Sequence, residues 1–208
     1  MSAVSPGSVV RDAYSPVPEL NLLKEFLERS GDHLSVIGFE LFDWDDDLDW
    51  FCGAAPDTYL DRLIPFAYAT SSGSYYALWR CDDRPDLAAL PVVFFGDEGD
   101  LCIEAGDLRE LFQLLGADPD PEELDDYFDL DAPQDRADRE RFDVTLAEYR
   151  EWLLREFGLA PLDSRDAVDE QRADAYALRF AHWIAEFADE GLLNHATRAL
   201  GVDISAEG

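Results

Sequence analysis

Basic residues are scarce in this chain, and Lys24 is its only lysine. The 208 residues contain 16 Lys and Arg against 47 Asp and Glu, which gives a formal net charge of −31. Nucleic-acid affinity depends on basic side chains that neutralise phosphates, and an acidic surface repels anionic membranes. We therefore expect no nucleic-acid partner and no membrane partner. A basic protein is the favoured partner, although the charge is also explained by surface solvation or by a salt-rich or high-GC source.

Cysteine is also scarce. The three cysteines, Cys52, Cys81 and Cys102, are an odd number at wide spacings, which fits neither a disulfide framework nor a zinc knuckle. We expect each to be a small buried hydrophobic residue in a reducing cytosol. The first thirty residues lack the pattern of a signal peptide, and no apolar run reaches membrane-spanning length. These features predict a cytoplasmic protein.

Recognisable catalytic and metal-binding motifs are missing as well. There is no P-loop, GxGxxG or GxSxG sequence, and His33, His182 and His195 lack metal-ligand spacing. The alternating acids of residues 43–49 do not form an EF-hand loop, because Leu48 and Ala54 occupy the positions that need Gly and Glu. We therefore expect no catalytic residue, no cofactor and no metal, and we interpret His182 as structural.

Hydrophobic residues are plentiful enough for a folded protein. They make up 47% of the chain, and aromatics make up 12%. Residues 1–17 are rich in Ser, Pro, Gly and Val, which predicts a flexible arm. A helix is expected from Pro18 to Gly31, followed by a strand in residues 36–42 and an acidic helical turn in residues 43–51.

Short apolar runs then alternate with turns. Strands are expected in residues 64–69, 75–80, 90–95 and 101–104, and short connections between them favour an antiparallel meander. A helix that Asp107 caps and Gly116 ends should pack one face on the sheet. Residues 18–116 are therefore expected to form an α+β domain, with an antiparallel sheet of about four to six strands flanked by helices.

The remainder of the chain is expected to be an acidic linker and a helical extension. Residues 117–135 contain eight acids between Asp118 and Asp131 and no base. In residues 136–208, two apolar stripes at helical spacing predict two helices that end at Gly158 and Gly191. These helices should pack on the α+β core or beside it. The first stripe is Phe142, Leu146, Tyr149, Leu153 and Phe157; the second is Tyr176, Phe180, Trp183 and Phe187.

The order of these segments resembles the SUKH superfamily, the Smi/Knr-like fold of bacterial immunity proteins and fungal cell-wall regulators. The similarity lies in residues 64–67 (IPFA), 75–79 (YYALW), 90–95 (LPVVFF), 97–99 (DEG) and 108–112 (LRELF). It covers about a quarter of the chain closely. The resemblance implies an α+β domain that acts by binding, with no shared catalytic residues.

The leading hypothesis is therefore an immunity protein that occludes a cognate, basic toxin domain and acts as a monomer or weak dimer. A general regulatory or scaffold protein of the Smi/Knr type is the alternative, and a divergent small hydrolase is a third. Acidic turns with neighbouring aromatic residues are the candidate contact surfaces. The candidate partner-binding residues are Asp43, Trp44, Asp45, Asp46, Asp47, Asp49, Trp50, Asp97, Glu98 and Asp100. For the two tryptophans, ordinary core packing is the competing interpretation.

Overall fold

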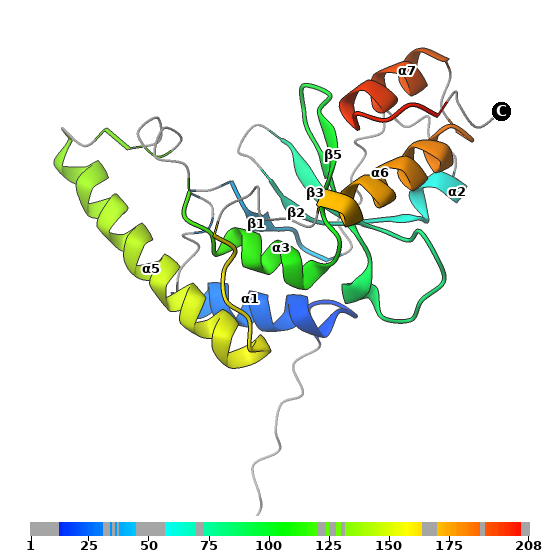
Figure 1. Cartoon of the computed structure of the whole chain (residues 1–208). Helices are drawn as coiled ribbons and strands as arrows, with labels where there is room; N and C mark the ends of the chain where they lie inside the picture. Colours follow the sequence, from blue (N-terminus) through cyan, green and yellow to red (C-terminus); the bar gives the residue numbers. More distant parts are fainter. Residues whose placement is uncertain are drawn as a thin grey trace, which may run out of the picture.

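The chain folds into three layers, with one antiparallel sheet between two groups of helices (Figure 1). A computed structural model describes residues 13–30, 34, 36, 38–44, 57–69, 73–119, 124, 128–129, 132–163, 170–187 and 190–204. The α+β class and the antiparallel meander predicted from the sequence are both confirmed.

The central sheet has five strands in the order β1-β2-β3-β4-β5, each antiparallel to its neighbour. The strands are β1 (Glu40–Leu41), β2 (Leu63–Tyr68), β3 (Tyr75–Trp79), β4 (Val92–Phe95) and β5 (Leu101–Ala105). The expected first strand, residues 36–42, is reduced to the two residues of β1, and Val36 lies in a helical turn. Val36 packs instead against a separate hydrophobic cluster that α5 helps to form.

Apolar side chains cover both faces of the central strands. In β3, Tyr76 and Leu78 enter the core on one face, while Ala77 and Trp79 enter the core on the other. Side chains alternate between faces along a strand, so a strand without polar positions must be covered on both sides. This explains why the sheet needs two helical layers.

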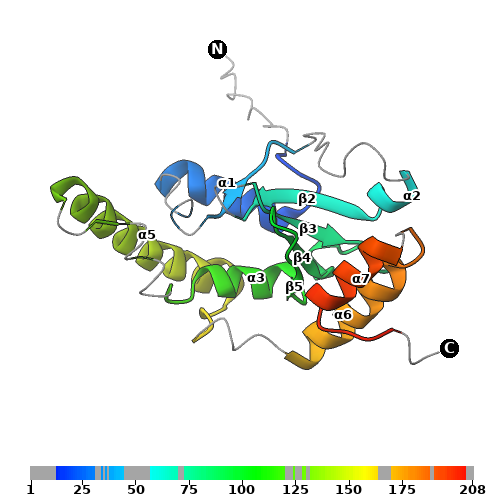
Figure 2. The ribbon, with the colours of Figure 1, turned by 90° about the horizontal axis from the view of Figure 1, so that it is seen from above.

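The first helical layer contains α1 (Pro18–Ser30), α3 (Leu108–Leu115) and α5 (Pro133–Phe157), which lie together on one side of the sheet in Figure 2. Phe26 of α1 packs against Tyr149 and Trp152 of α5, with ring centroids 5.6 and 5.2 Å apart. The cap predicted for α3 is present, because the Asp107 side chain accepts a hydrogen bond from the backbone N–H of Glu110. The helix stripe that begins at Phe142 is thus core, as expected.

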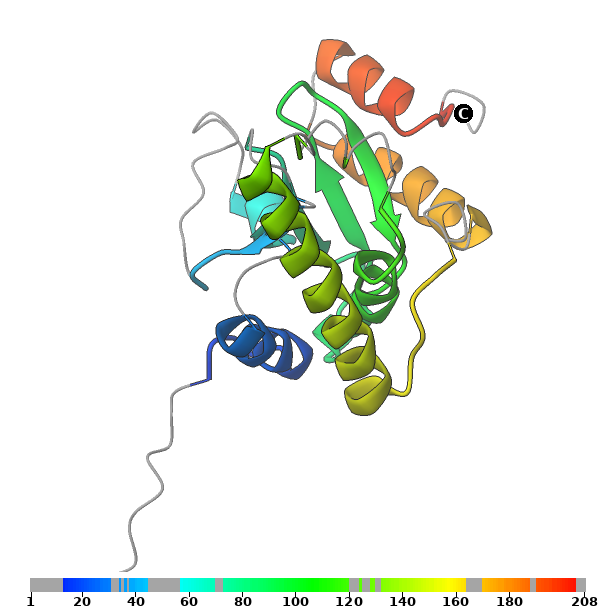
Figure 3. The ribbon, with the colours of Figure 1, turned by 90° about the vertical axis from the view of Figure 1, so that its left-hand side faces the viewer.

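Part of the predicted acidic linker, residues 117–135, belongs to this layer. Its Leu124 and Phe128 are buried against Phe142 and Leu146 of α5. The helix itself begins at Pro133, three residues before the expected start, because proline is favoured in a first helical turn. Figure 3 shows α5 lying across the outside of the molecule.

The second layer contains α2 (Asp57–Leu60), α6 (Glu170–Ile184) and α7 (Glu190–Ala199) on the opposite face of the sheet. Trp79 of β3 contacts Phe180 of α6 edge-to-face, at 4.9 Å between ring centroids. Tyr59 of α2 stacks on Trp183 at 4.8 Å with an interplanar angle of 10°. These aromatic contacts join the C-terminal helices to the sheet.

Two further expectations need correction. The predicted arm, residues 1–17, includes Ser15 and Val17, which are buried, and the backbone N–H of Ser15 donates to the Asn21 side chain. The second C-terminal helix ends at Ile184, so Gly191 lies within the additional helix α7. That break was missed because the apolar spacing continues to Phe187.

The residues expected to form an acidic helical turn, 43–51, lie outside the described residues from position 45 onward. Within the part of the chain that the structure describes, no helix is both long and apolar enough to cross a membrane.

Candidate functional site

The candidate contact residues fall into two groups, at different places in the fold. Asp43 and Trp44 follow β1 at one edge of the sheet, while Asp97, Glu98 and Asp100 lie in the turn between β4 and β5 at the other edge. With three strands between β1 and β5, the edges are separated by roughly 20 Å at the usual strand spacing. The remaining candidates lie outside the described residues: Asp45, Asp46, Asp47, Asp49 and Trp50.

In the first group, Asp43 is exposed and Trp44 is half-buried. Trp44 packs against the core cluster of the first helical layer and makes an edge-to-face contact with Tyr14, at 6.2 Å between ring centroids. The Tyr14 hydroxyl donates to the carbonyl oxygen of Phe42 at 2.5 Å. Core packing, the competing interpretation, therefore accounts for much of the Trp44 side chain.

The second group forms a well-defined turn, which we call the acidic hairpin (residues 96–100). The backbone N–H of Gly96 donates to the backbone carbonyl of Asp100 at 2.7 Å, and that of Gly99 donates to the carbonyl of Gly96 at 3.0 Å. Gly99 has a φ of 97°, which favours glycine. Asp97, Glu98 and Asp100 are all exposed, so the turn presents three carboxylates from a closed backbone.

Contacts from two other elements hold the acidic hairpin in place. The Ser74 hydroxyl donates to the Asp97 carboxylate at 2.7 Å and accepts from the Asp97 backbone N–H at 3.1 Å. On the other side, Nε2 of His195 in α7 lies 2.6 Å from the carbonyl oxygen of Gly99. The carboxylates are therefore presented on a fixed support, which lowers the entropy lost on binding.

Few cations are available to neutralise these carboxylates. Arginines elsewhere pair with nearby acids, as Arg62 does with Asp83 and Arg150 does with Asp118. Neither Glu98 nor Asp100 pairs with a lysine or arginine among the described residues. The acidic hairpin is thus a local source of negative potential.

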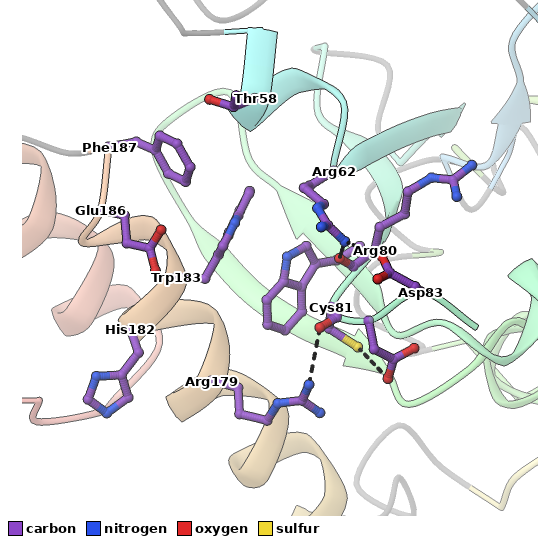
Figure 4. Close-up of a pocket in the computed structure, with 12 residues that line it drawn as sticks. Thr58, Arg62, Arg80, Cys81, Asp83, Arg179, His182, Trp183, Glu186 and Phe187 are labelled. Carbon is purple, nitrogen blue, oxygen red and sulfur yellow. Dashed lines mark hydrogen bonds and ion pairs between the residues drawn. The ribbon is translucent and has the colours of Figure 1, made fainter.

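A separate cavity of about 660 Å³ opens between β3, α2 and α6, in the second helical layer (Figure 4). We call it the β3–α6 cavity. It lies at the end of β3 opposite the acidic hairpin, because Ser74 precedes the strand and Trp79 ends it. Its lining residues are Thr58, Arg62, Trp79, Arg80, Cys81, Asp82, Asp83, Arg179, His182, Trp183, Glu186 and Phe187.

Aromatic rings and guanidinium groups meet in this cavity. The Arg179 guanidinium lies 5.9 Å from the ring centroid of Trp79 and 5.6 Å from that of Tyr176, which are cation–π distances. It also donates to the carbonyl oxygen of Cys81 at 3.3 Å. The Arg62 guanidinium donates to the carbonyl of Arg80 and to the Asp83 carboxylate. In Figure 4, Arg62 is directed to the carbonyl of Arg80 and Arg179 to that of Cys81, so the two guanidinium groups reach neighbouring residues from different elements.

The pKa values of three groups in and around the cavity differ from their ordinary values. Two hydrogen bonds from Arg84 lower the pKa of the Asp82 carboxyl, so Asp82 stays ionised and the pKa of Arg84 is raised in turn. Burial raises the pKa of the Cys81 thiol despite the nearby Arg179. Because the thiolate is the reactive form, this site does not activate Cys81 as a nucleophile.

Two expectations about these residues change. Cys81 and Cys102 are free thiols that are only partly buried, so the prediction of buried cysteines is wrong for both, and Cys52 lies outside the described residues. His182, interpreted as structural, is exposed and lies at the margin of the cavity, where Figure 4 shows its ring directed away from Arg62. One sequence signal could have revealed part of this lining. Arg179, Trp183 and Glu186 follow one another at spacings of four and three residues, which places side chains on one face of a helix.

No cluster of three or more metal-ligating side chains occurs among the described residues. Comparisons with protein-family models, with curated proteins and with solved structures found no match for this chain. The site must therefore be interpreted from its own geometry.

Proposed function

We propose that this chain is a cytoplasmic, non-enzymatic binding protein of the SUKH type that neutralises a basic toxin domain by occlusion. The observation that carries the proposal is the acidic hairpin, because it presents Asp97, Glu98 and Asp100 together on a braced turn. A net charge of −31 adds a long-range attraction for a basic partner. The strand order that resembles the SUKH superfamily supports the same class.

The acidic hairpin suits recognition of a cationic surface for two physical reasons. Its carboxylates already have a fixed backbone, so binding does not have to order the turn. Glu98 and Asp100 form no ion pair with a lysine or arginine among the described residues, so at these two positions no such pair has to break before a basic side chain of the partner can approach. Complementary charge of this kind contributes mainly to association rate and specificity.

The experiment is co-expression with a candidate toxin, taken from the products of the genes that neighbour the gene for this protein, with growth as the measurement. Wild-type protein is expected to restore growth. A variant that combines Asp97→Asn, Glu98→Gln and Asp100→Asn is expected to restore it poorly, because the amides keep the shape of the turn and remove its charge. If the wild-type protein does not restore growth, the antidote proposal is wrong.

A matched control separates the position of the charges from their number. Glu25→Gln, Glu28→Gln and Asp163→Asn remove the same total charge from exposed positions away from the acidic hairpin. The control variant is expected to restore growth as the wild type does. Equal loss of rescue in both triple variants would mean that overall charge, and not the acidic hairpin, carries the function.

A further inference from the structure

We propose that the β3–α6 cavity binds an oxyanion carried on an aromatic ring. This site lies apart from the acidic hairpin, and the proposal does not depend on the proposed function. Its volume of about 660 Å³ falls within the range of roughly 300–1,000 Å³ that small-molecule pockets occupy. Its lining combines aromatic surface with converging hydrogen-bond donors, the usual arrangement of a ligand pocket.

A buried donor without an acceptor is the first observation that points to a ligand. Trp79 is 2% exposed, and its indole Nε1 has no hydrogen-bond partner among the described residues. An indole nitrogen can only donate, and a buried donor without a partner destabilises the folded protein. A bound acceptor would satisfy this donor once the side chains that cover Nε1 make room for it.

Guanidinium groups supply further donors to the same cavity. Each guanidinium has five N–H donors, and Arg179 uses one of them on the carbonyl oxygen of Cys81. Arg62 donates from one nitrogen to the Arg80 carbonyl and to Asp83. Arginine suits carboxylate and phosphate groups because its planar fork can make two parallel hydrogen bonds. Arg179 therefore keeps N–H donors that no hydrogen bond among the described residues uses.

The acids that line the cavity do not cancel this preference. Asp82 is held by Arg84, which lies outside the lining, and Asp83, whose side chain is 93% exposed, pairs with Arg62. Glu186 is also exposed, and it lies in the turn that directly follows α6. The acids therefore lie in solvent or in closed pairs, whereas Trp79 forms a buried part of the lining.

Aromatic side chains explain why the anion should carry a ring. Trp183 and Phe187 line the cavity with ring centroids 5.5 Å apart, and Trp183 also lies 5.6 Å from Trp79. Aromatic side chains that meet at interplanar angles of 63° and 45° can contact both the face and the edge of a ligand ring, which favours an aromatic ligand. Arg179, already stacked near Trp79, can contact both the ring and its anionic substituent.

The test is calorimetry of the purified chain with four probes of related shape. Phenyl phosphate carries both features, inorganic phosphate has only the anion, benzyl alcohol has only the ring, and benzylammonium replaces the anion with a cation. We expect phenyl phosphate to bind more tightly than the other three. Benzylammonium binding as tightly as phenyl phosphate would overturn the proposal, because Asp83, Glu186 and the rings would then form a cation site.

A matched pair of variants locates the binding. Arg179→Gln should weaken phenyl phosphate about tenfold, as expected for a hydrogen bond to a charged group. Arg198→Gln on α7 removes an equal charge from an exposed residue outside the cavity and should leave the affinity unchanged. Unchanged affinity in Arg179→Gln would refute the site, provided that its melting temperature matches the wild type.

The indole resonances give a second readout that a purely structural role would not move. Phenyl phosphate should shift the Nε1–H signal of Trp79, which Trp79→Phe identifies by its disappearance. A shift confined to other tryptophans would contradict the proposed position of the anion.

Discussion

The packing of Phe180 in the second helical layer allows the stability lost on its truncation to be predicted. Its ring is fully buried between the sheet and α6, with centroid distances of 4.9 Å to Trp79 and 5.3 Å to Trp183. A buried phenylalanine removes roughly 200 Å² from water, which is worth about 5 kcal/mol at ~25 cal/mol per Å². The methyl group that alanine retains reduces the expected loss.

We therefore expect Phe180→Ala to lower the free energy of unfolding by about 4 kcal/mol, within the usual range for such truncations. For a chain of this length the melting temperature should fall by roughly 8–16 °C. Urea denaturation followed by tryptophan fluorescence measures the change, and the slope against urea should match the wild type if compactness is preserved.

Leu154→Ala is the control, because the Leu154 side chain on α5 is 61% exposed. Its effect should stay within about 0.5 kcal/mol, as for ordinary surface positions. A loss below about 1 kcal/mol in Phe180→Ala would refute the packing of α6 on the sheet, since no other described element covers Trp79 in the same way.

Three further predictions concern single contacts. Tyr149→Phe should cost about 1–2 kcal/mol in urea denaturation, because the Phe112 carbonyl loses the buried donor that lies 2.9 Å away; no loss would contradict that hydrogen bond. Gly99→Ala should lower the free energy of unfolding by about 1–2 kcal/mol, since φ is 97° and a Cβ would lie 2.8 Å from Nε2 of His195. An unchanged melting temperature would contradict the backbone conformation described for the acidic hairpin. Asp82 has a lowered pKa, so its stabilising effect should be constant above about pH 5 and should disappear as the pH falls below about 4. The stability difference between wild type and Asp82→Asn measures it, and a difference that grows on acidification would contradict the sign.

The sequence predicted the local elements well and their assembly less well. Strands such as β3 and β4, together with the capped helix α3, follow from β-prone residues, turns and the Asp107 cap. What the pattern did not reveal is that α5 and α6 cover opposite faces of the sheet. An apolar stripe shows that a helix is buried, but it does not say which surface buries it.

The candidate site shows the same limit. Turn residues predicted the acidic hairpin, because Gly, Asp and Glu between two apolar strands signal a solvent-exposed connection. The β3–α6 cavity was missed because Arg62, Trp79 and Arg179 are far apart in sequence and meet only when the layers assemble. Its one local signal, the shared face of α6, is also typical of an ordinary amphipathic helix.

The association rate with the basic partner tests the central claim most directly. Stopped-flow measurements at two salt concentrations should compare wild type with the triple variant at Asp97, Glu98 and Asp100 and with its matched triple control at Glu25, Glu28 and Asp163. If the acidic hairpin is the contact, its variant should associate more slowly than the control and show a weaker salt dependence than the control, because charge near the contact contributes most to the encounter. Equal rates for the two variants would contradict the account.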